Sequence, residues 1–366
     1  MDIYPRAEYG SLDRYLPDHS PIAFDLSDNR NLWGAHPAAL EALASAGSRT
    51  ASEYPESYAE RFAASAAARF GVDAREVTTG AGGTGMLDAI MRAVAPTEMR
   101  YLDPGWPPAS MLAVANGHRP VPVEWSEGID DPVRFAGGGP CIVFLANPAN
   151  PTGETVTDDW IRALLAHTER VGSVLIIDEA YGEYSRDADD TTPIAMALGS
   201  ERALCVKTLS KAYGLAGLRI GYALASEALA LEVDKARGPF MVSGTSTAAA
   251  AAAIASDSPW LAETVARSRA NRERVGRSLR ARGYDVAQSA ANFVFVRVPD
   301  ADLDEVARRL ERSGVRARPF RSRSPAGTGL RATVGPWEAM QRLLDAFDLA
   351  AADRSSRPQD ERLRGG

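Results

Sequence analysis

The chain has 366 residues, of which 45% are hydrophobic and 24% are charged, and its formal net charge is −7. This composition is that of a globular protein, and a mild negative charge without a dense basic run argues against a nucleic-acid partner. No run of 18 apolar residues and no secretory signal pattern occurs, so we expect no membrane partner and a cytoplasmic location. Cys141 and Cys205 lie in apolar runs and are expected to be buried free thiols.

Short apolar runs alternate with helix-like segments from about residue 72 to residue 225. The pattern predicts an amphipathic helix over 155–172, with apolar residues along one face. Buried strands are predicted before and after this helix, at 141–146, 174–178, 203–207 and 219–224. The alternation predicts an α/β domain with a mostly parallel sheet, in which a ligand binds at the carboxyl ends of the strands.

The pattern changes after about residue 255. A helix (258–283), a strand (291–298), a second helix (301–313) and a strand (329–335) are predicted there, and the alanine-rich stretch 247–255 is expected to be helical. A smaller α+β domain should therefore follow the large one. We expect an N-terminal segment packing on the small domain and the active site (1–40), a large ligand-binding domain (41–255), the small domain (256–350) and a flexible tail (351–366).

Polar residues that could carry chemistry follow the predicted strands. Asn150 lies in the turn "NPANPTG" (147–153), where two Asn-Pro steps exclude a helix. Asp178 closes the next strand, and Tyr181 comes three residues later. The third strand is followed by Thr208, Ser210 and Lys211. Before all of these, the glycine-rich stretch "TTGAGGTGML" (78–87) leads into an apolar helix, which suits a phosphate held by backbone N–H groups.

Three motifs in this order resemble one enzyme family. "NPANPTG" (147–153), "DEAY" (178–181) and "SKAYGLAGLR" (210–219) look like those of the pyridoxal-phosphate-dependent aminotransferases of the aspartate aminotransferase fold, known as fold type I, class I/II. Within this family the chain is most similar to the histidinol-phosphate aminotransferase branch, over roughly residues 20–350. The resemblance implies pyridoxal 5′-phosphate as the cofactor, no metal, and amino acid and 2-oxo acid substrates.

The resemblance also implies the catalytic roles. Lys211 would form the Schiff base with the cofactor aldehyde and, once displaced by the substrate, move the proton between Cα and C4′. This chemistry needs an amine that is deprotonated part of the time, and low polarity with a nearby cation lowers the pKa of a lysine. Asp178 would pair with the protonated pyridine nitrogen and keep the ring an electron sink. Tyr181 and Asn150 would bond the phenolic oxygen.

Further residues match cofactor and substrate contacts of the family. The phosphate ligands would be Gly83, Thr84, Thr208, Ser210 and Arg219. Trp106, in "YLDPGWPPAS", falls where the family stacks an aromatic ring on the cofactor, although a core aromatic after a Pro-Gly turn is an alternative interpretation. Arg331, in "GLRATVG", matches the arginine that grips the substrate's α-carboxylate. Tyr54 matches a tyrosine that reaches the partner's cofactor phosphate, which implies a homodimer.

The N-terminal segment departs from the histidinol-phosphate pattern. "NRNLWG" (29–34) has Arg30 in place of glutamate and Trp33 in place of tyrosine, and the phosphate loop reads "GAGGTG" (80–85). We therefore expect a substrate other than histidinol phosphate, bound beside Arg30, Trp33 and Gly34. Either most of the nearby arginines face solvent, or Arg30 or one of four others reaches the pocket and favours an anionic or phosphorylated side chain: Arg316, Arg318, Arg321 and Arg323.

Two other functions remain open on the sequence alone. The same carbanion chemistry could decarboxylate a phosphorylated amino acid or cyclise a biosynthetic precursor, because the bond that breaks at Cα depends on the pose of the substrate. A non-catalytic ligand-sensing module is the second, but such modules usually accompany a DNA-binding domain, for which the fold leaves no residues here. We expect transamination.

Overall fold

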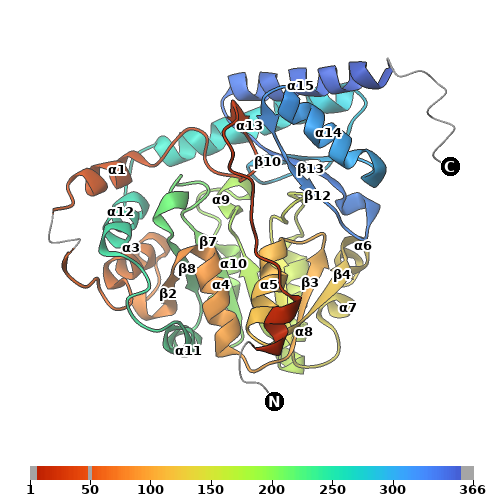
Figure 1. The fold of residues 1–366 in the computed structure, drawn as a ribbon. Helices are drawn as coiled ribbons and strands as arrows, with labels where there is room; N and C mark the ends of the chain where they lie inside the picture. Colours follow the sequence, from red (N-terminus) through yellow and green to blue (C-terminus); the bar gives the residue numbers. More distant parts are fainter. Residues whose placement is uncertain (1–5, 48–51, 356–366) are drawn as a thin grey trace.

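A computed structural model describes residues 6–47 and 52–355 (Figure 1). Its largest element is a seven-stranded sheet with the order β2-β8-β7-β6-β5-β3-β4. The strands are β2 (Val77–Gly80), β3 (Glu98–Asp103), β4 (Arg119–Glu124), β5 (Ile142–Ala146), β6 (Val174–Asp178), β7 (Ala203–Thr208) and β8 (Gly221–Leu224). Only β8 runs antiparallel to its neighbours in this sheet. The predicted α/β architecture with a mostly parallel sheet is confirmed.

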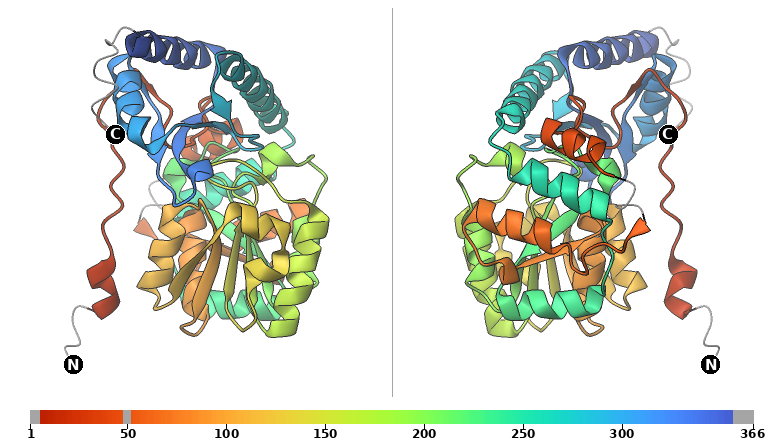
Figure 2. Two further views of the ribbon diagram at one scale, coloured as in Figure 1. Left: turned by 90° about the vertical axis from the view of Figure 1, so that its right-hand side faces the viewer. Right: turned by 90° about the vertical axis from the view of Figure 1, so that its left-hand side faces the viewer.

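Each central strand contacts two apolar layers. Val143 and Leu145 of β5 belong to one core cluster, whereas Ile142 and Phe144 belong to another on the opposite face. Because side chains alternate along a strand, this continuous apolar run requires helices on both faces. The first face is covered by α3 (Glu60–Phe70), α7 (Pro132–Ala136), α8 (Asp158–Val171), α10 (Thr192–Leu198) and α12 (Gly244–Ile254), and the second by α4 (Gly82–Ala93), α5 (Pro107–Ala115) and α11 (Glu227–Arg237) (Figure 2).

Helix α8 shows why the local sequence forms these elements. It begins after Thr157, whose Oγ1 accepts a hydrogen bond from the N–H of Trp160 (3.3 Å). It ends at Gly172, which has a left-handed φ of 78° that glycine adopts without steric cost. Ile161 and Leu164 are fully buried against the sheet. The helix predicted over 155–172 is confirmed.

A second, antiparallel sheet follows, with the order β12-β13-β10-β9. Its strands are β9 (Asp285–Val286), β10 (Phe293–Arg297), β12 (Arg318–Phe320) and β13 (Gly329–Thr333), and its helices are α13 (Trp260–Ala281), α14 (Asp300–Arg312) and α15 (Trp337–Ser355). The N-terminal segment runs from the region of α5 up to this sheet, where β1 (Phe24–Asp25) pairs with β11 (Val315–Arg316) (Figure 1). Helix α1 (Pro37–Ala44) then packs against α12.

Short elements complete the described chain. They are α6 (Trp125–Asp130), α9 (Gly182–Ser185) and four 3-10 turns at Ala7–Ser11, Ala74–Glu76, Ala216–Leu218 and Pro325–Gly327. Two boundaries differ from expectation. Strand β8 begins only at Gly221, because Arg219 has a left-handed φ of 49° and leaves the strand direction. Helix α15 continues through Ser355, past the start of the predicted tail, since 350–352 are alanines and favour helix; residues 356–366 lie outside the described part of the chain.

Candidate active site

A cavity of about 210 Å³ lies at the carboxyl ends of β5, β6 and β7. Every residue predicted to bind the cofactor, except Tyr54, lines it: Gly83, Thr84, Trp106, Asn150, Asp178, Tyr181, Thr208, Ser210, Lys211 and Arg219. The rest of the wall is Leu87, Ala146, Pro148, Ala180, Val206, Lys207 and Ala216. A mostly apolar wall with a few convergent polar groups is typical of a cofactor site.

The chain contains three lysines, and their environments differ. Lys235 lies on the surface of α11 in an exposed ion pair. Burial favours the neutral form of Lys207, but the carboxylates of Glu183 and Glu179 outweigh burial and hold its pKa well above the usual range. Its ammonium lies 3.2 Å and 3.3 Å from these carboxylates, on the side of β7 away from the cavity. Lys211 is the third.

Lys211 has the amine best suited to react with an aldehyde. Its Nζ donates a hydrogen bond to the backbone oxygen of Asp28 (3.0 Å), which is a neutral acceptor. Burial, and then the charge of Arg331, lower its pKa to about 8. A lysine with this pKa is neutral, and therefore nucleophilic, in a substantial fraction of molecules near neutral pH.

Asp178 and Tyr181 face the cavity from the end of β6. The Oδ1 of Asp178 accepts a hydrogen bond from the N–H of Ala180 (2.9 Å), and burial raises the pKa of the carboxyl to about 6, so that it is ionised above neutral pH. The hydroxyl of Tyr181 accepts hydrogen bonds from the side-chain amides of Asn29 (2.9 Å) and Asn150 (3.3 Å). A phenol that accepts from both sides keeps its own proton free to donate into the cavity.

Hydrogen-bond donors gather at the other end of the cavity. Thr208 Oγ1 lies 3.0 Å from Ser210 Oγ, which lies 3.4 Å from a guanidinium nitrogen of Arg219. The first turn of α4 begins at Gly82, which has a left-handed φ of 76°. Glycine adopts this φ without steric cost, and the absence of a Cβ also leaves room for the Arg219 guanidinium next to the helix terminus. Hydroxyls, a guanidinium and free helix N–H groups fit a phosphate dianion.

The opposite side of the cavity opens toward the antiparallel sheet. Arg331 of β13 is 5% exposed and donates to Asn150 Oδ1 (2.6 Å) and to the backbone oxygen of Ser27 (2.6 Å). Its Nε is buried and has no acceptor among the described residues. Burial lowers the pKa of Arg331 to about 10, and the guanidinium lies 5.5 Å and 5.0 Å from the ring centres of Phe293 and Phe320. An incompletely bonded buried guanidinium fits a carboxylate ligand.

Five of the predicted residues do not line this cavity. Arg331 is one of them and adjoins the cavity only through its hydrogen bond to Asn150. Arg30 is half-exposed and lies 3.8 Å from Asp28, and Trp33 packs on the core of the antiparallel sheet. Gly34 has a φ of 105° and its carbonyl abuts Gly214, so it shapes the chain rather than the wall. Tyr54 is 89% exposed on the surface of the subunit. The match of "NRNLWG" to the family's N-terminal motif placed Arg30, Trp33 and Gly34 near the substrate, but the Arg30 and Trp33 side chains make other contacts and Gly34 has no side chain.

Only one of the four additional arginines approaches Arg331. Arg318 pairs with Arg331 in the register of β12 and β13, so both side chains lie on one face of the sheet. The others are accounted for elsewhere: Arg316 is buried against Asp18, Asp25 and Glu311, Arg321 pairs on the surface with Asp300 and Asp304, and Arg323 is exposed.

Two polar residues of the site are missing from the sequence prediction. Asn29 reaches Tyr181 from the N-terminal segment, and its backbone N–H bonds Thr333 Oγ1 (2.9 Å). Lys207 borders the cavity next to Thr208, although its ammonium lies on the other face of the sheet, against Glu179 and Glu183. The only sequence signal for Asn29 is that "NRNLWG" retains the asparagine of the family's N-terminal motif. No local sequence pattern identifies Lys207.

Comparison with known proteins places the chain in a family. The family model for aminotransferase class I and II matches residues 21–347. An aromatic amino acid aminotransferase of Streptomyces avermitilis is 33% identical over 91% of this chain and 94% of its own length. A histidinol-phosphate aminotransferase of Bordetella parapertussis is 32% identical over 95% of this chain and 98% of its own. The crystal structure of histidinol-phosphate aminotransferase from Sinorhizobium meliloti with pyridoxal 5′-phosphate superposes with a TM-score of 0.82 at 26% identity, over 94% and 97% of the two chains.

The chain therefore belongs to the aminotransferase class I and II family. It is a pyridoxal-phosphate-dependent aminotransferase of fold type I, as the sequence motifs predicted. Its substrates are of the amino acid and 2-oxo acid classes. Within the described ranges, no helix is both long and apolar enough to span a bilayer.

Proposed function

We propose that Lys211 holds the cofactor and that the other cavity residues orient it. The observation that carries this proposal is the lysine of low pKa that shares one cavity with Asp178, while Arg331 adjoins that cavity through its hydrogen bond to Asn150. Pyridoxal 5′-phosphate, when bound, supplies an aldehyde and an electron-withdrawing ring. Asp178 would keep the ring nitrogen protonated, Trp106 would cover the ring, and Gly83, Thr84, Thr208, Ser210 and Arg219 would hold the phosphate.

Lys211 and Tyr181 would also move or hold protons. With a substrate amine in its place on the cofactor, Lys211 would be a free amine of lowered pKa that could take a proton from the substrate Cα and return it. Tyr181, whose hydroxyl accepts from two amides, would donate its own proton to the phenolic oxygen of a bound cofactor. Asn150 contacts both Tyr181 and Arg331, so it links the cofactor side of the cavity to the substrate side.

Arg331 would bind the α-carboxylate of the substrate. Its Nε needs an acceptor, and a carboxylate could accept from Nε and one terminal nitrogen together. This two-point contact would fix the substrate so that its Cα–H bond points at Lys211. Because every amino acid carries this group, Arg331 cannot select a side chain.

Arg318 is the residue near Arg331 that could select an anionic side chain. It lies beside Arg331 and stacks on Tyr15, with its guanidinium carbon 5.9 Å from the ring centre. Two neighbouring guanidiniums repel unless an anion lies between them. Burial lowers the pKa of Arg331 most, and the positive charge of Arg318 lowers it further. We therefore expect a substrate with a second negative group, a carboxylate or a phosphate.

A panel of half-reactions tests the substrate. Aspartate, glutamate and phosphothreonine should convert the cofactor faster than leucine, phenylalanine and tryptophan, as followed by visible absorbance. Histidinol phosphate, which has a phosphate but no α-carboxylate, completes the anionic half of the panel. Replacing Arg318 by glutamine should slow the anionic substrates about ten- to a hundredfold, since a charge-assisted hydrogen bond contributes about 1.5–3 kcal/mol. The neutral substrates should be unaffected, and Arg321→Gln, which removes an exposed arginine, is the control. Faster conversion of the apolar or aromatic amino acids would contradict the anionic preference.

The active unit is, in our proposal, a homodimer. Tyr54 is 89% exposed, and its ring lies 5.3 Å from that of Phe240. Phe240 and Met241 are themselves 47% and 52% exposed, so an apolar surface surrounds the tyrosine. A second copy would cover this surface and receive the Tyr54 hydroxyl at its own cofactor phosphate.

Mixed dimers test whether Tyr54 acts across the interface. A dimer of one Tyr54→Phe subunit and one Lys211→Ala subunit should have one intact site, because both lesions fall in the other site. Activity of the mixture should therefore exceed that of the two parent dimers taken separately. The Tyr54→Phe parent should bind the cofactor about ten- to a hundredfold more weakly, through loss of one hydrogen bond to a charged group. Mixtures without added activity would place Tyr54 in its own subunit's site or outside both.

We also propose a cytoplasmic location and a division of the chain at about residue 255. Both cysteines are buried free thiols, which suits a reducing compartment. The division falls between α12 and α13, where the chain passes from the large sheet to the antiparallel one.

A further inference from the structure

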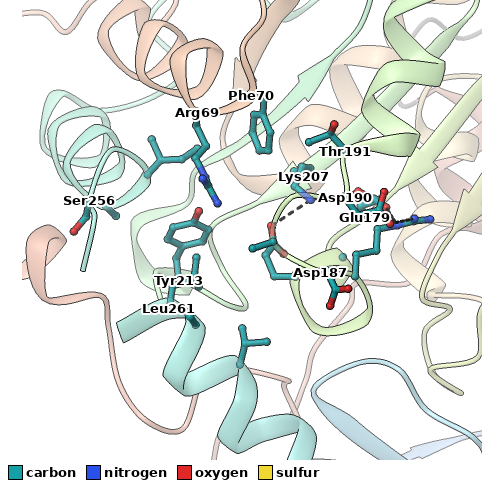
Figure 3. A pocket seen from close by; sticks show the side chains of 18 of the residues that line it. Arg69, Phe70, Glu179, Asp187, Asp190, Thr191, Lys207, Tyr213, Ser256 and Leu261 are labelled. Carbon is teal, nitrogen blue, oxygen red and sulfur yellow. Dashed lines mark hydrogen bonds and ion pairs between the residues drawn. The ribbon is translucent and has the colours of Figure 1, made fainter. Parts of the chain in front are cut away.

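A second cavity, of about 560 Å³, lies on the other face of the large sheet. The ends of α3 and α12, the loop 182–191 and the first turns of α13 surround it (Figure 3). Cys205 and Lys207 of β7 point to this face, whereas Val206 and Thr208 belong to the catalytic side. The two cavities therefore lie on opposite faces of the sheet, share strand β7, and have Lys207 in both walls.

Part of the wall of this second cavity consists of residues that are close in sequence to residues of the catalytic cavity. Five wall residues lie within two positions of residues in the catalytic cavity: Glu179 next to Asp178, Gly182 and Glu183 one and two after Tyr181, Lys207 next to Thr208, and Tyr213 two after Lys211. A ligand here would contact the backbone segments that position the cofactor.

Most charges around this cavity are matched. Lys207 lies within ion-pair distance of Glu179 and Glu183, and Glu179 also accepts a hydrogen bond from Arg186 (2.9 Å). Arg186 in turn pairs with two surface aspartates. These ion pairs balance the charges of the innermost part of the wall without a ligand.

Two further groups of opposite charge border the cavity. One carboxylate oxygen of Glu183, Oε2, is buried and has no donor among the described residues. Arg69, at the end of α3, is exposed to solvent, and its guanidinium points toward the hydroxyl of the buried Tyr213 (Figure 3). Because the last torsion of a glutamate is soft, Glu183 can turn this oxygen toward the cavity at little cost.

One side of the wall is apolar. Leu261 and Val265 of α13 face the cavity together with Ile254 of α12 and Phe70 of α3, and polar residues such as Ser256 and Asp257 lie at its edge. Val265 and Ile254 are part of the buried core. A ligand for this site needs an apolar body as well as one positive and one negative group.

We propose that this cavity binds a free α-amino acid with an apolar side chain, separately from the catalytic site. The carboxylate would accept hydrogen bonds from Arg69 and Tyr213, the ammonium would donate to Glu183, and the side chain would pack against Leu261 and Val265. Each of the two charged contacts is a charge-assisted hydrogen bond, and the apolar wall excludes purely hydrophilic zwitterions.

Calorimetric titration of the holoenzyme with L-phenylalanine tests this site without turnover. The enzyme carries Arg331→Gln and is reduced with borohydride, so that the catalytic site can neither react nor hold a carboxylate at Arg331. We expect one binding event per chain to remain. Adding Arg69→Gln or Glu183→Gln should weaken it about tenfold or more, whereas Arg61→Gln, which removes an exposed arginine of the same helix, should not.

Analogues separate the two charged contacts. 3-Phenylpropanoate, which lacks the ammonium, and 2-phenylethylamine, which lacks the carboxylate, should each bind about tenfold more weakly than L-phenylalanine. No binding to the reduced Arg331→Gln enzyme, or binding that Arg69→Gln leaves unchanged, would overturn the proposal. Equal affinity for either analogue would overturn the zwitterion site as well. Because none of these readouts needs catalysis, failure here leaves the roles of Lys211 and Asp178 untouched.

Discussion

Replacing Lys211 by alanine should abolish transamination, with a loss on the order of 10⁴-fold or more in rate. Two functions would disappear with one side chain: the amine that holds the cofactor, and the base that moves the proton at the substrate Cα. The variant should keep the fold, because Lys211 makes a single hydrogen bond, to the backbone of Asp28. Rates of single turnovers with L-glutamate provide the measurement.

Lys235→Ala is the matched control for this experiment. Lys235 lies on the surface in an exposed ion pair, so its removal should change the rate little. A Lys211→Ala protein that still turns over within tenfold of the wild type would exclude Lys211 as the proton-moving base.

Replacing Asp178 by asparagine should lower the rate on the order of 10³-fold while the cofactor is largely retained. Asparagine can still accept the hydrogen bond from Ala180, so the end of β6 should keep its shape. It cannot carry the negative charge that keeps the ring nitrogen protonated, and several kcal/mol of transition-state stabilisation would be lost. Near-normal turnover would show that another group serves the ring nitrogen.

The pH dependence gives a second readout on Asp178. Burial raises the pKa of its carboxyl to about 6, so the apo-protein should have an ionised Asp178 above this pH and a neutral one below. Affinity for the cofactor should therefore fall as the pH drops through about 6 in the wild type. In Asp178→Asn the same step should be absent.

Residues at the ends of strands were predictable because the signal is local. Asp178 closes an apolar run that can only be a buried strand, and parallel strands bring their carboxyl ends to one edge. Lys211 and Asn150 follow the neighbouring strands, so their meeting in one cavity needed no long-range information beyond the strand order. The sheet itself assembles this part of the site.

The substrate side depended on contacts between distant parts of the chain. Asn29 reaches Tyr181 across 152 positions, and Arg318 meets Arg331 only through the pairing of β12 with β13. Arg30 lies next to Asn29 in sequence, yet the left-handed φ of 57° at Asn29 directs the chain so that Arg30 faces solvent. No periodicity in the N-terminal segment indicates such a turn.

The most direct test of the central claim is to map the cofactor's attachment point. Borohydride turns the link between the cofactor aldehyde and a lysine into a stable secondary amine, and the chain offers only Lys207, Lys211 and Lys235 as partners. Mass spectrometry of a digest of the reduced holoenzyme should find the cofactor mass on Lys211 alone, because Lys207 is held as an ammonium by two glutamates and Lys235 is on the surface. Cofactor mass on Lys207 or Lys235, or a fully reduced holoenzyme with Lys211 unmodified, would contradict the account.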